Sequence, residues 1–130
     1  MQVRDGMTTL VLSVGPAHTL REAARSMAER KVGAAVVVDP DTSGIGILTE
    51  RDVLDAIGNG LDPDAEAASD HLTSDLVFAS PDWTLEDAAR TMIRGGFRHL
   101  VVMDGDEVVG MLSVRDIVRC WSDAPAAAAG

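Results

Sequence analysis

The sequence lacks most of the features that would build a disulfide-bonded or membrane-spanning protein. Its single cysteine, Cys120, excludes an internal disulfide and a cysteine-rich zinc site. No apolar run approaches the roughly 20 residues that a transmembrane helix needs. The first residues, MQVRDGMTTLVLSV, lack the basic start and the long apolar core of a signal peptide. We therefore expect a cytoplasmic location and no membrane partner.

Basic residues are also scarce. The chain has 11 Lys and Arg residues against 21 Asp and Glu residues, which gives a formal net charge of −10. Because such a chain repels a phosphate backbone, broad nucleic-acid binding is not expected. A small nucleotide needs only a local set of hydrogen-bond donors and is not excluded. The sequence has no P-loop, no catalytic set at a known spacing and no metal cluster, so it predicts neither an enzyme nor a required cofactor.

What the sequence does contain is an internal duplication. Residues 16–39 align without a gap on residues 81–104, and GILTERD (46–52) aligns on GMLSVRD (110–116) after the loss of one residue in the turn. Upstream of these segments the similarity continues, because Asp5, Met7 and Thr8 fall on Asp70, Leu72 and Thr73.

The duplication sets the expected domain organisation. We predict a first repeat over residues 1–60, a linker over 61–67 and a second repeat over 68–122. The stretch GNGLDPDAEA (58–67), which ends with this linker, is rich in Gly, Asp and Ala. Residues 123–130 are low in complexity, and we expect a flexible tail there.

Each copy has the pattern of a β-α-β-β-α unit. In the first copy a short apolar stretch ends before Pro16, and Leu20, Ala23 and Met27 then recur at helical spacing. A run rich in β-branched residues (34–38) predicts a buried strand, and a second strand follows the turn. The second copy repeats this order, so the expected fold class is mixed α/β (α+β) with two β-α-β-β-α repeats.

A last helix is expected to begin at each of the two strings. We expect its apolar side chains to face inward; they are Val53, Leu54 and Ile57 in the first copy, and Ile117, Val118 and Trp121 in the second.

The hydroxyl and carboxylate of each string have two interpretations. Thr49 with Asp52, and Ser113 with Asp116, fit a helix capping box, in which each side chain satisfies an unpaired backbone N–H group. Thr19 with Glu22 and Thr84 with Asp87 fit the same pattern at the other two helices. Alternatively, a strand that leads directly into a helix N-terminus presents N–H groups to a phosphate, and the carboxylate can accept hydrogen bonds from a ribose diol. Spacing alone favours the capping interpretation, because the motif is short.

Taken as a whole, the sequence resembles a tandem pair of cystathionine-β-synthase (CBS) domains, also called a Bateman module, of the small stand-alone bacterial type. The resemblance rests on TLREAARSMAERKVGAAVVVD (19–39), TLEDAARTMIRGGFRHLVVMD (84–104) and both strings. It implies two repeats packed about a pseudo-twofold axis with two clefts between them. It also implies a homodimer, and an output that passes through an unidentified partner protein.

The family pattern implies ligand-binding roles for particular residues. It assigns Thr49 and Asp52 to one cleft and Ser113 and Asp116 to the other, with the aspartate on the ribose and the hydroxyl near phosphate. Arg51 and Arg115 stand between them, either as phosphate contacts or as solvated helix residues.

A basic pair distinguishes the two copies. Nucleotide-binding relatives often carry a basic pair before the central strand, and Arg98 and His99 match it, whereas the first copy has Gly33 and Ala34. The resemblance thus implies a regulatory module that binds an adenosine-type nucleotide (AMP, ADP, ATP or S-adenosylmethionine), with the second copy as the phosphate site. The alternative is a ligand-free dimerising scaffold.

Overall fold

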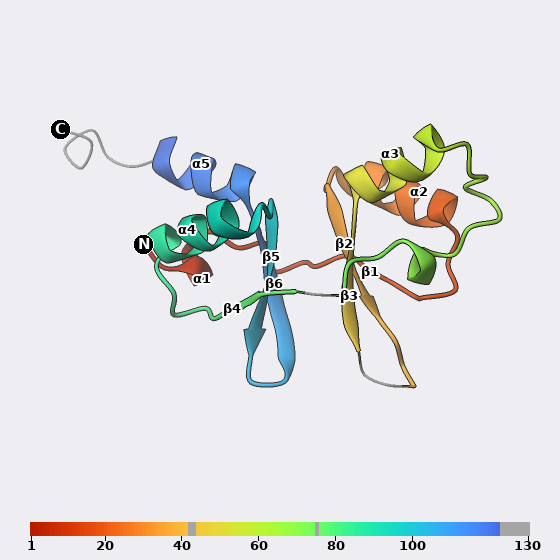
Figure 1. The fold of residues 1–130 in the computed structure, drawn as a ribbon. Helices are drawn as coiled ribbons and strands as arrows, with labels where there is room; N and C mark the ends of the chain where they lie inside the picture. Colours follow the sequence, from red (N-terminus) through yellow and green to blue (C-terminus); the bar gives the residue numbers. More distant parts are fainter. Residues whose placement is uncertain (42–43, 75, 123–130) are drawn as a thin grey trace. The chain divides into compact units, whose positions relative to one another are not determined.

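Each sequence repeat folds as a β-α-β-β-α unit, as Figure 1 shows. The computed structural model describes residues 1–41, 44–74 and 76–122, so the predicted tail lies outside the described residues. The elements are α1 (Val3–Gly6), β1 (Ser13–Val14), α2 (Leu20–Arg30), β2 (Ala34–Val38), β3 (Ile45–Thr49), α3 (Glu50–Gly58), the 3-10 helix η1 (Ala68–Asp70), β4 (Phe78–Ala79), α4 (Leu85–Gly95), β5 (His99–Asp104), β6 (Glu107–Ser113) and α5 (Val114–Ser122). The predicted mixed α/β class with two repeats is confirmed.

The two three-stranded sheets have the same topology. Their strand orders are β1-β2-β3 and β4-β5-β6, with the first pair parallel and the second pair antiparallel. The antiparallel register pairs Ala34 with Thr49 in one sheet and His99 with Ser113 in the other. The start of each central strand therefore lies beside the point where the last helix of its repeat begins.

Helices α2 and α4 pack onto their sheets through equivalent stripes. The buried residues are Leu20, Ala23 and Met27 in α2, and Leu85, Ala88 and Met92 in α4. The small alanine in each stripe lets the helix approach its sheet closely. Each helix ends at a residue in the left-handed region, which is Lys31 (φ 56°) for α2 and Gly96 (φ 70°) for α4.

The compact units of the structure differ from the sequence repeats by an exchange of segments. One unit comprises residues 11–76, and the other joins residues 1–10 to the chain from residue 77 onward. Val3 is fully buried in the core of the second repeat, and its N–H donates to the Trp83 carbonyl (2.7 Å). Ala68 is equivalent to Val3 by the duplication, and its N–H donates to the His18 carbonyl (2.7 Å) in the first repeat. The leading segment of each copy thus completes the core of the other copy.

The predicted linker lies along the start of α2. The backbone N–H groups of Leu20 and Arg21 donate to the carbonyls of Glu66 (3.0 Å) and Pro63 (3.1 Å). The Arg21 side chain also forms a hydrogen-bonded ion pair with Asp64. The hydrogen bond to Asp64 raises the pKa of Arg21 above its ordinary value. These contacts hold the linker against the first repeat.

The glycine that opens each string makes room for the exchanged segment. A Cβ atom at Gly46 would lie 2.6 Å from the Leu72 side chain. One at Gly110 would lie 2.6 Å from the Met7 sulfur and 3.0 Å from the Thr8 carbonyl oxygen. Since Met7 and Leu72 are equivalent by the duplication, the same steric requirement explains both glycines.

Replacing Gly110 with alanine is expected to lower the free energy of unfolding by about 1–3 kcal/mol, because the Thr8 backbone cannot move aside easily. Gly46→Ala should cost less, since its close neighbour is the flexible end of Leu72. Gly58→Ala serves as the control, because a Cβ atom there meets nothing within 4 Å. Urea denaturation measures all three, and equal stabilities of the Gly110 and Gly58 variants would contradict the packing described here.

The prediction that the apolar residues of the last helices face inward is wrong for four of the six. Ile117 is buried, and Val53 is partly buried against its core, but Leu54, Ile57, Val118 and Trp121 are each more than half exposed. Ala56 and Cys120, three residues after Val53 and Ile117, supply the rest of the buried stripe in α3 and α5. The neighbouring stripe is therefore left on the surface.

Candidate functional site

Four of the predicted site residues meet where β6 leads into α5. Ser113 ends β6 opposite His99, the first residue of β5. The N–H of Val114 donates to the Arg98 carbonyl (2.9 Å), which joins the start of α5 to the basic pair. Asp116 lies in the first turn of α5 and accepts from the Ser113 N–H (2.8 Å). We call this group the second junction.

The first repeat has an equivalent first junction. Thr49 ends β3 opposite Ala34, and the Glu50 N–H donates to the Gly33 carbonyl (2.9 Å). Asp52 lies in the first turn of α3 and accepts from the Thr49 N–H (2.8 Å). The backbone arrangement of the two junctions is the same, so their side chains account for any difference in chemistry.

The capping interpretation is confirmed at both junctions. The Asp52 N–H donates to the Thr49 hydroxyl (3.2 Å), and the Asp116 N–H donates to the Ser113 hydroxyl (3.0 Å). Thr19 and Glu22 also form the full box at α2. At α4 only the bond from the Asp87 N–H to the Thr84 hydroxyl (3.0 Å) is made.

Capping leaves each junction able to bind a ligand. An ionised carboxylate has about four acceptor positions, of which the box uses one. Each capping hydroxyl accepts in the box and keeps its proton to donate. Within the described residues, no side chain forms an ion pair with Asp52. The two interpretations of the strings are therefore compatible.

The two aspartates differ in burial and pairing. Asp116 is 6% exposed, and it is the one buried charged residue among those that the structure describes. Its Oδ1 forms an ion pair with Nη1 of Arg119 (3.2 Å). The corresponding position in the first repeat holds Asp55, and Asp52 is only partly buried.

The charges around the two junctions are opposite in sign. At the first junction the Glu50 carboxyl group lies over Gly33, 3.2 Å from the position of an added Cβ atom. The second junction has Val114 in place of Glu50 and the exposed Arg98 in place of Gly33. Arg51 and Arg115 are equivalent, exposed and unpaired within the described part of the chain. A phosphate therefore meets a more favourable field at the second junction.

Sequence reasoning missed Glu50 and Arg119. Each stands at a position where the two copies carry different residues, Glu50 against Val114 and Asp55 against Arg119. Position-by-position comparison of charge along the last helices would have detected both.

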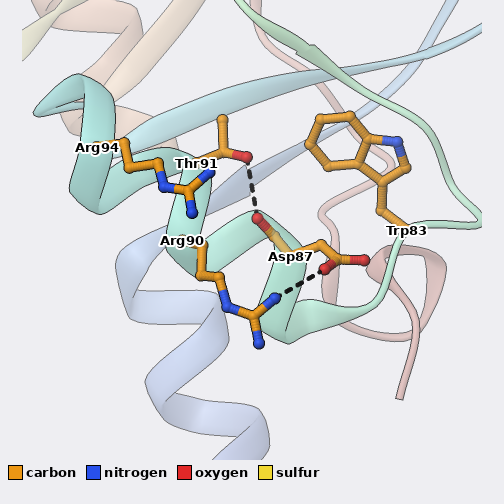
Figure 2. Close-up of a pocket in the computed structure, with 5 residues that line it drawn as sticks. All are labelled: Trp83, Asp87, Arg90, Thr91 and Arg94. Carbon is orange, nitrogen blue, oxygen red and sulfur yellow. Dashed lines mark hydrogen bonds and ion pairs between the residues drawn. The ribbon is translucent and has the colours of Figure 1, made fainter.

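An open pocket of about 260 Å³ lies elsewhere, on the surface of α4 (Figure 2). Its lining consists of Trp83, Asp87, Arg90, Thr91 and Arg94. Arg90 pairs with the Asp87 carboxylate (3.3 Å), and the Thr91 hydroxyl donates to the Asp87 carbonyl (2.9 Å), as the dashed lines in Figure 2 mark. Because Arg90, Asp87 and Thr91 bond to one another and the lining includes no predicted site residue, the pocket supports no ligand assignment.

Residues 1–41, 44–74 and 76–122 lack two other kinds of feature, a metal site and a membrane-spanning helix. Those residues contain no group of three or more His, Cys, Asp or Glu side chains that could hold a metal ion. They also contain no helix that is long and apolar enough to cross a bilayer.

Comparison with known proteins decides the family. The CBS domain model matches residues 2–59 and 68–123. The chain belongs to the CBS domain family. It is 35% identical to the CBS domain-containing protein YhcV of Bacillus subtilis over 88% of this chain and 81% of that protein. It is 33% identical to an uncharacterized protein of Methanocaldococcus jannaschii over 90% of this chain, but it spans only 41% of that protein.

Solved CBS structures share the fold. An uncharacterized conserved protein of Pyrococcus horikoshii superposes with a TM-score of 0.86 and 26% identity, over 95% of this chain and 93% of that one. A CBS domain protein of Pyrobaculum aerophilum complexed with AMP superposes with a TM-score of 0.81 and 28% identity, over 95% of this chain and 100% of that one. CBS pairs of this kind are generally regulatory modules without catalytic activity.

Proposed function

We propose that this chain is a regulatory module that senses an adenosine nucleotide through its second CBS repeat. The observation that carries the proposal is the meeting of Arg98 and His99 with Ser113 at the N-terminus of α5. The nine-residue helix α5 directs the partial positive charge of its N-terminus toward this point. The AMP complex of the Pyrobaculum aerophilum relative supports the choice of ligand class.

Each residue of the second junction has a role in this proposal. Arg98 forks onto the phosphate oxygens, and His99 and Arg115 add donors. The Ser113 hydroxyl donates to the phosphate while it caps the helix. Asp116 accepts from the ribose hydroxyls.

The first junction is proposed to take a less charged ligand or none. Thr49, Arg51 and Asp52 are in place there, but Glu50 brings a carboxylate where the second junction has none. A phosphate near Glu50 is repelled, whereas an uncharged diol on Asp52 is not.

Regulation requires that the nucleotide distinguish two states of the protein. A ligand shifts a conformational equilibrium only to the extent that it binds one state more tightly than the other. No catalytic step or resident cofactor is part of this proposal, so the output passes to another protein.

Thermal melting with a panel of AMP, ADP, ATP and S-adenosylmethionine tests the proposal, with GMP as the control. A ligand at a hundred times its Kd stabilises the folded state by about 2.7 kcal/mol, which a melting curve detects easily. We expect AMP, ADP or ATP to raise the Tm more than S-adenosylmethionine, because the second junction is built for phosphate. An unchanged Tm with every adenosine ligand at millimolar concentration would refute the proposal.

A dimerising scaffold is a second candidate function, and one observation favours it. Two helical positions are apolar and more than half exposed in both repeats. They are occupied by Leu54 and Ile57 in α3, and by Val118 and Trp121 in α5. Repeated exposure of large apolar groups at equivalent positions is typical of an interaction surface. We propose that these helix faces join two copies of the chain, with or without a bound nucleotide.

The double substitution Val118→Glu and Trp121→Glu is expected to convert this dimer into a monomer, because it buries two carboxylates in an apolar contact. Light scattering after size-exclusion chromatography gives the mass. Leu10→Glu is the control, since Leu10 is 81% exposed but lies outside the helices. A double variant that keeps the mass of two chains would place the dimer contact elsewhere.

A further inference from the structure

Arg119 connects the second junction to the first ten residues of the chain. Its Nη1 lies 3.2 Å from Oδ1 of Asp116. Its Nη2 donates to the carbonyl oxygen of Gly6, also at 3.2 Å. One guanidinium group therefore contacts both the proposed ribose-binding carboxylate and the last residue of α1.

The carbonyl that Arg119 contacts is held in a closely packed place. Gly6 is buried, and a Cβ atom there would lie 2.9 Å from the sulfur of Cys120 and 3.6 Å from Leu85. The segment 1–10 has little room to shift at this point. Arg119 can keep both contacts only while the segment stays in this place.

The carboxylate needs this partner in the absence of a ligand. The Asp116 side chain is 9% exposed, and the Arg119 side chain is 55% exposed. A buried carboxylate that loses its cation is strongly disfavoured. Either Arg119 or another group must therefore satisfy Oδ1.

The first repeat lacks the equivalent arrangement. Asp55 occupies the position of Arg119 and adds a negative charge one turn after Asp52. The difference is specific to the repeat that carries the basic pair.

We propose that Arg119 competes with the ligand for Asp116, so that ligand binding at the second junction loosens the segment 1–10. This inference rests on the proposed function in one respect, which is that the ribose binds Asp116. Ribose hydroxyls on Oδ1 take the place of Nη1, and Arg119 then keeps only its bond to Gly6. Binding and release are coupled reciprocally, so release of the segment raises the affinity for the ligand by the same factor.

Hydrogen exchange tests the connection without any ligand. Asp116→Asn keeps an oxygen that can accept from the Ser113 N–H, but it removes the negative charge that orients Arg119. We expect it to raise the exchange rate of the Met7 and Thr8 amides, which bond to Val3 and Met111, by about fivefold. Asp52→Asn is the matched variant in the first repeat, where Asp55 stands in place of Arg119, and it should leave these amides unchanged. If Asp116→Asn leaves them unchanged as well, the proposal is overturned.

Arg119→Lys is a second variant, which tests the same connection if Asp116→Asn disturbs folding. A lysine keeps a positive charge near Asp116, but its side chain is shorter and has one nitrogen in place of the Nη1 and Nη2 atoms that reach the two partners separately, so the same two amides should exchange faster. The Val101 and Val102 amides of β5 report on the fold and should stay protected in each variant.

Titration with AMP separates this proposal from the proposed function. In the wild-type protein, AMP should accelerate exchange at Met7 and Thr8, and Arg119→Lys should reduce that response. If AMP binds by calorimetry and these amides do not respond, the coupling is overturned and the nucleotide site stands. If neither AMP nor any other adenosine ligand of the panel binds, the proposed function is overturned, and the ligand-free comparison still decides whether Arg119 holds the segment.

Discussion

Replacing Arg98 with alanine is expected to weaken AMP binding by roughly ten- to a hundredfold. Arg98 is exposed, directly precedes β5 at the second junction and forms no ion pair within the described residues, so its guanidinium is available for a phosphate. A hydrogen bond to a charged group contributes about 1.5–3 kcal/mol, which sets the size of the effect. Isothermal titration calorimetry at fixed ionic strength measures the change in Kd.

The control for Arg98→Ala is Arg94→Ala, which removes the same charge from the end of α4. Arg98→Lys should recover only part of the affinity, because an ammonium group keeps the charge but lacks the planar fork. If the Arg94 variant loses as much affinity as the Arg98 variant, the effect comes from net charge, and Arg98 has no specific role.

Replacing Val3 with aspartate is expected to unfold the unit that contains the second repeat. Val3 is fully buried in that unit's core, together with Leu85 and Leu112. An uncompensated buried charge costs several kcal/mol, which is comparable to the whole stability of a small domain. Near-ultraviolet circular dichroism follows Trp83, which packs against the same core.

Leu10→Asp is the control for the Val3 variant. It introduces the same charge in the same segment at a side chain that is 81% exposed, and it should leave the Tm within about 1–2 °C. A Val3 variant as stable as the Leu10 variant would mean that residues 1–10 do not complete the core of the second repeat.

The element order was predictable because each copy carries local signals for it. The caps at Thr19, Thr49, Thr84 and Ser113 place the helix starts, and the β-branched run of residues 34–38 fixes the central strand of the first sheet. Burial of the last helices was harder to predict. In a nine-residue helix with apolar residues at three or more positions, two neighbouring stripes fit the same spacing.

The exchange of segments was not predictable from the sequence. Met7 and Leu72 occupy equivalent positions in the two copies. The local sequence pattern therefore does not indicate whether each leading segment packs on its own copy or on the other one. The choice depends on contacts between residues that are far apart in the chain, such as Thr8 with Met111 and Ile47 with Thr73. Only these contacts explain why each string begins with a glycine.

The candidate site was predictable where the two copies could be compared. Arg98 and His99 stand where the first copy has Gly33 and Ala34, and this difference in the sequence distinguishes the two junctions. The ion pair between Asp116 and Arg119 required the structure, because a carboxylate three residues before an arginine on a helix is common and is usually exposed.

The most direct test of the nucleotide site is a titration of the isotopically labelled protein with AMP, followed by amide chemical shifts. The account predicts the largest changes at Arg98, His99 and Ser113 to Asp116, with smaller changes from Thr49 to Asp52. Changes concentrated at the first junction, or no change at any junction at millimolar AMP, would contradict it.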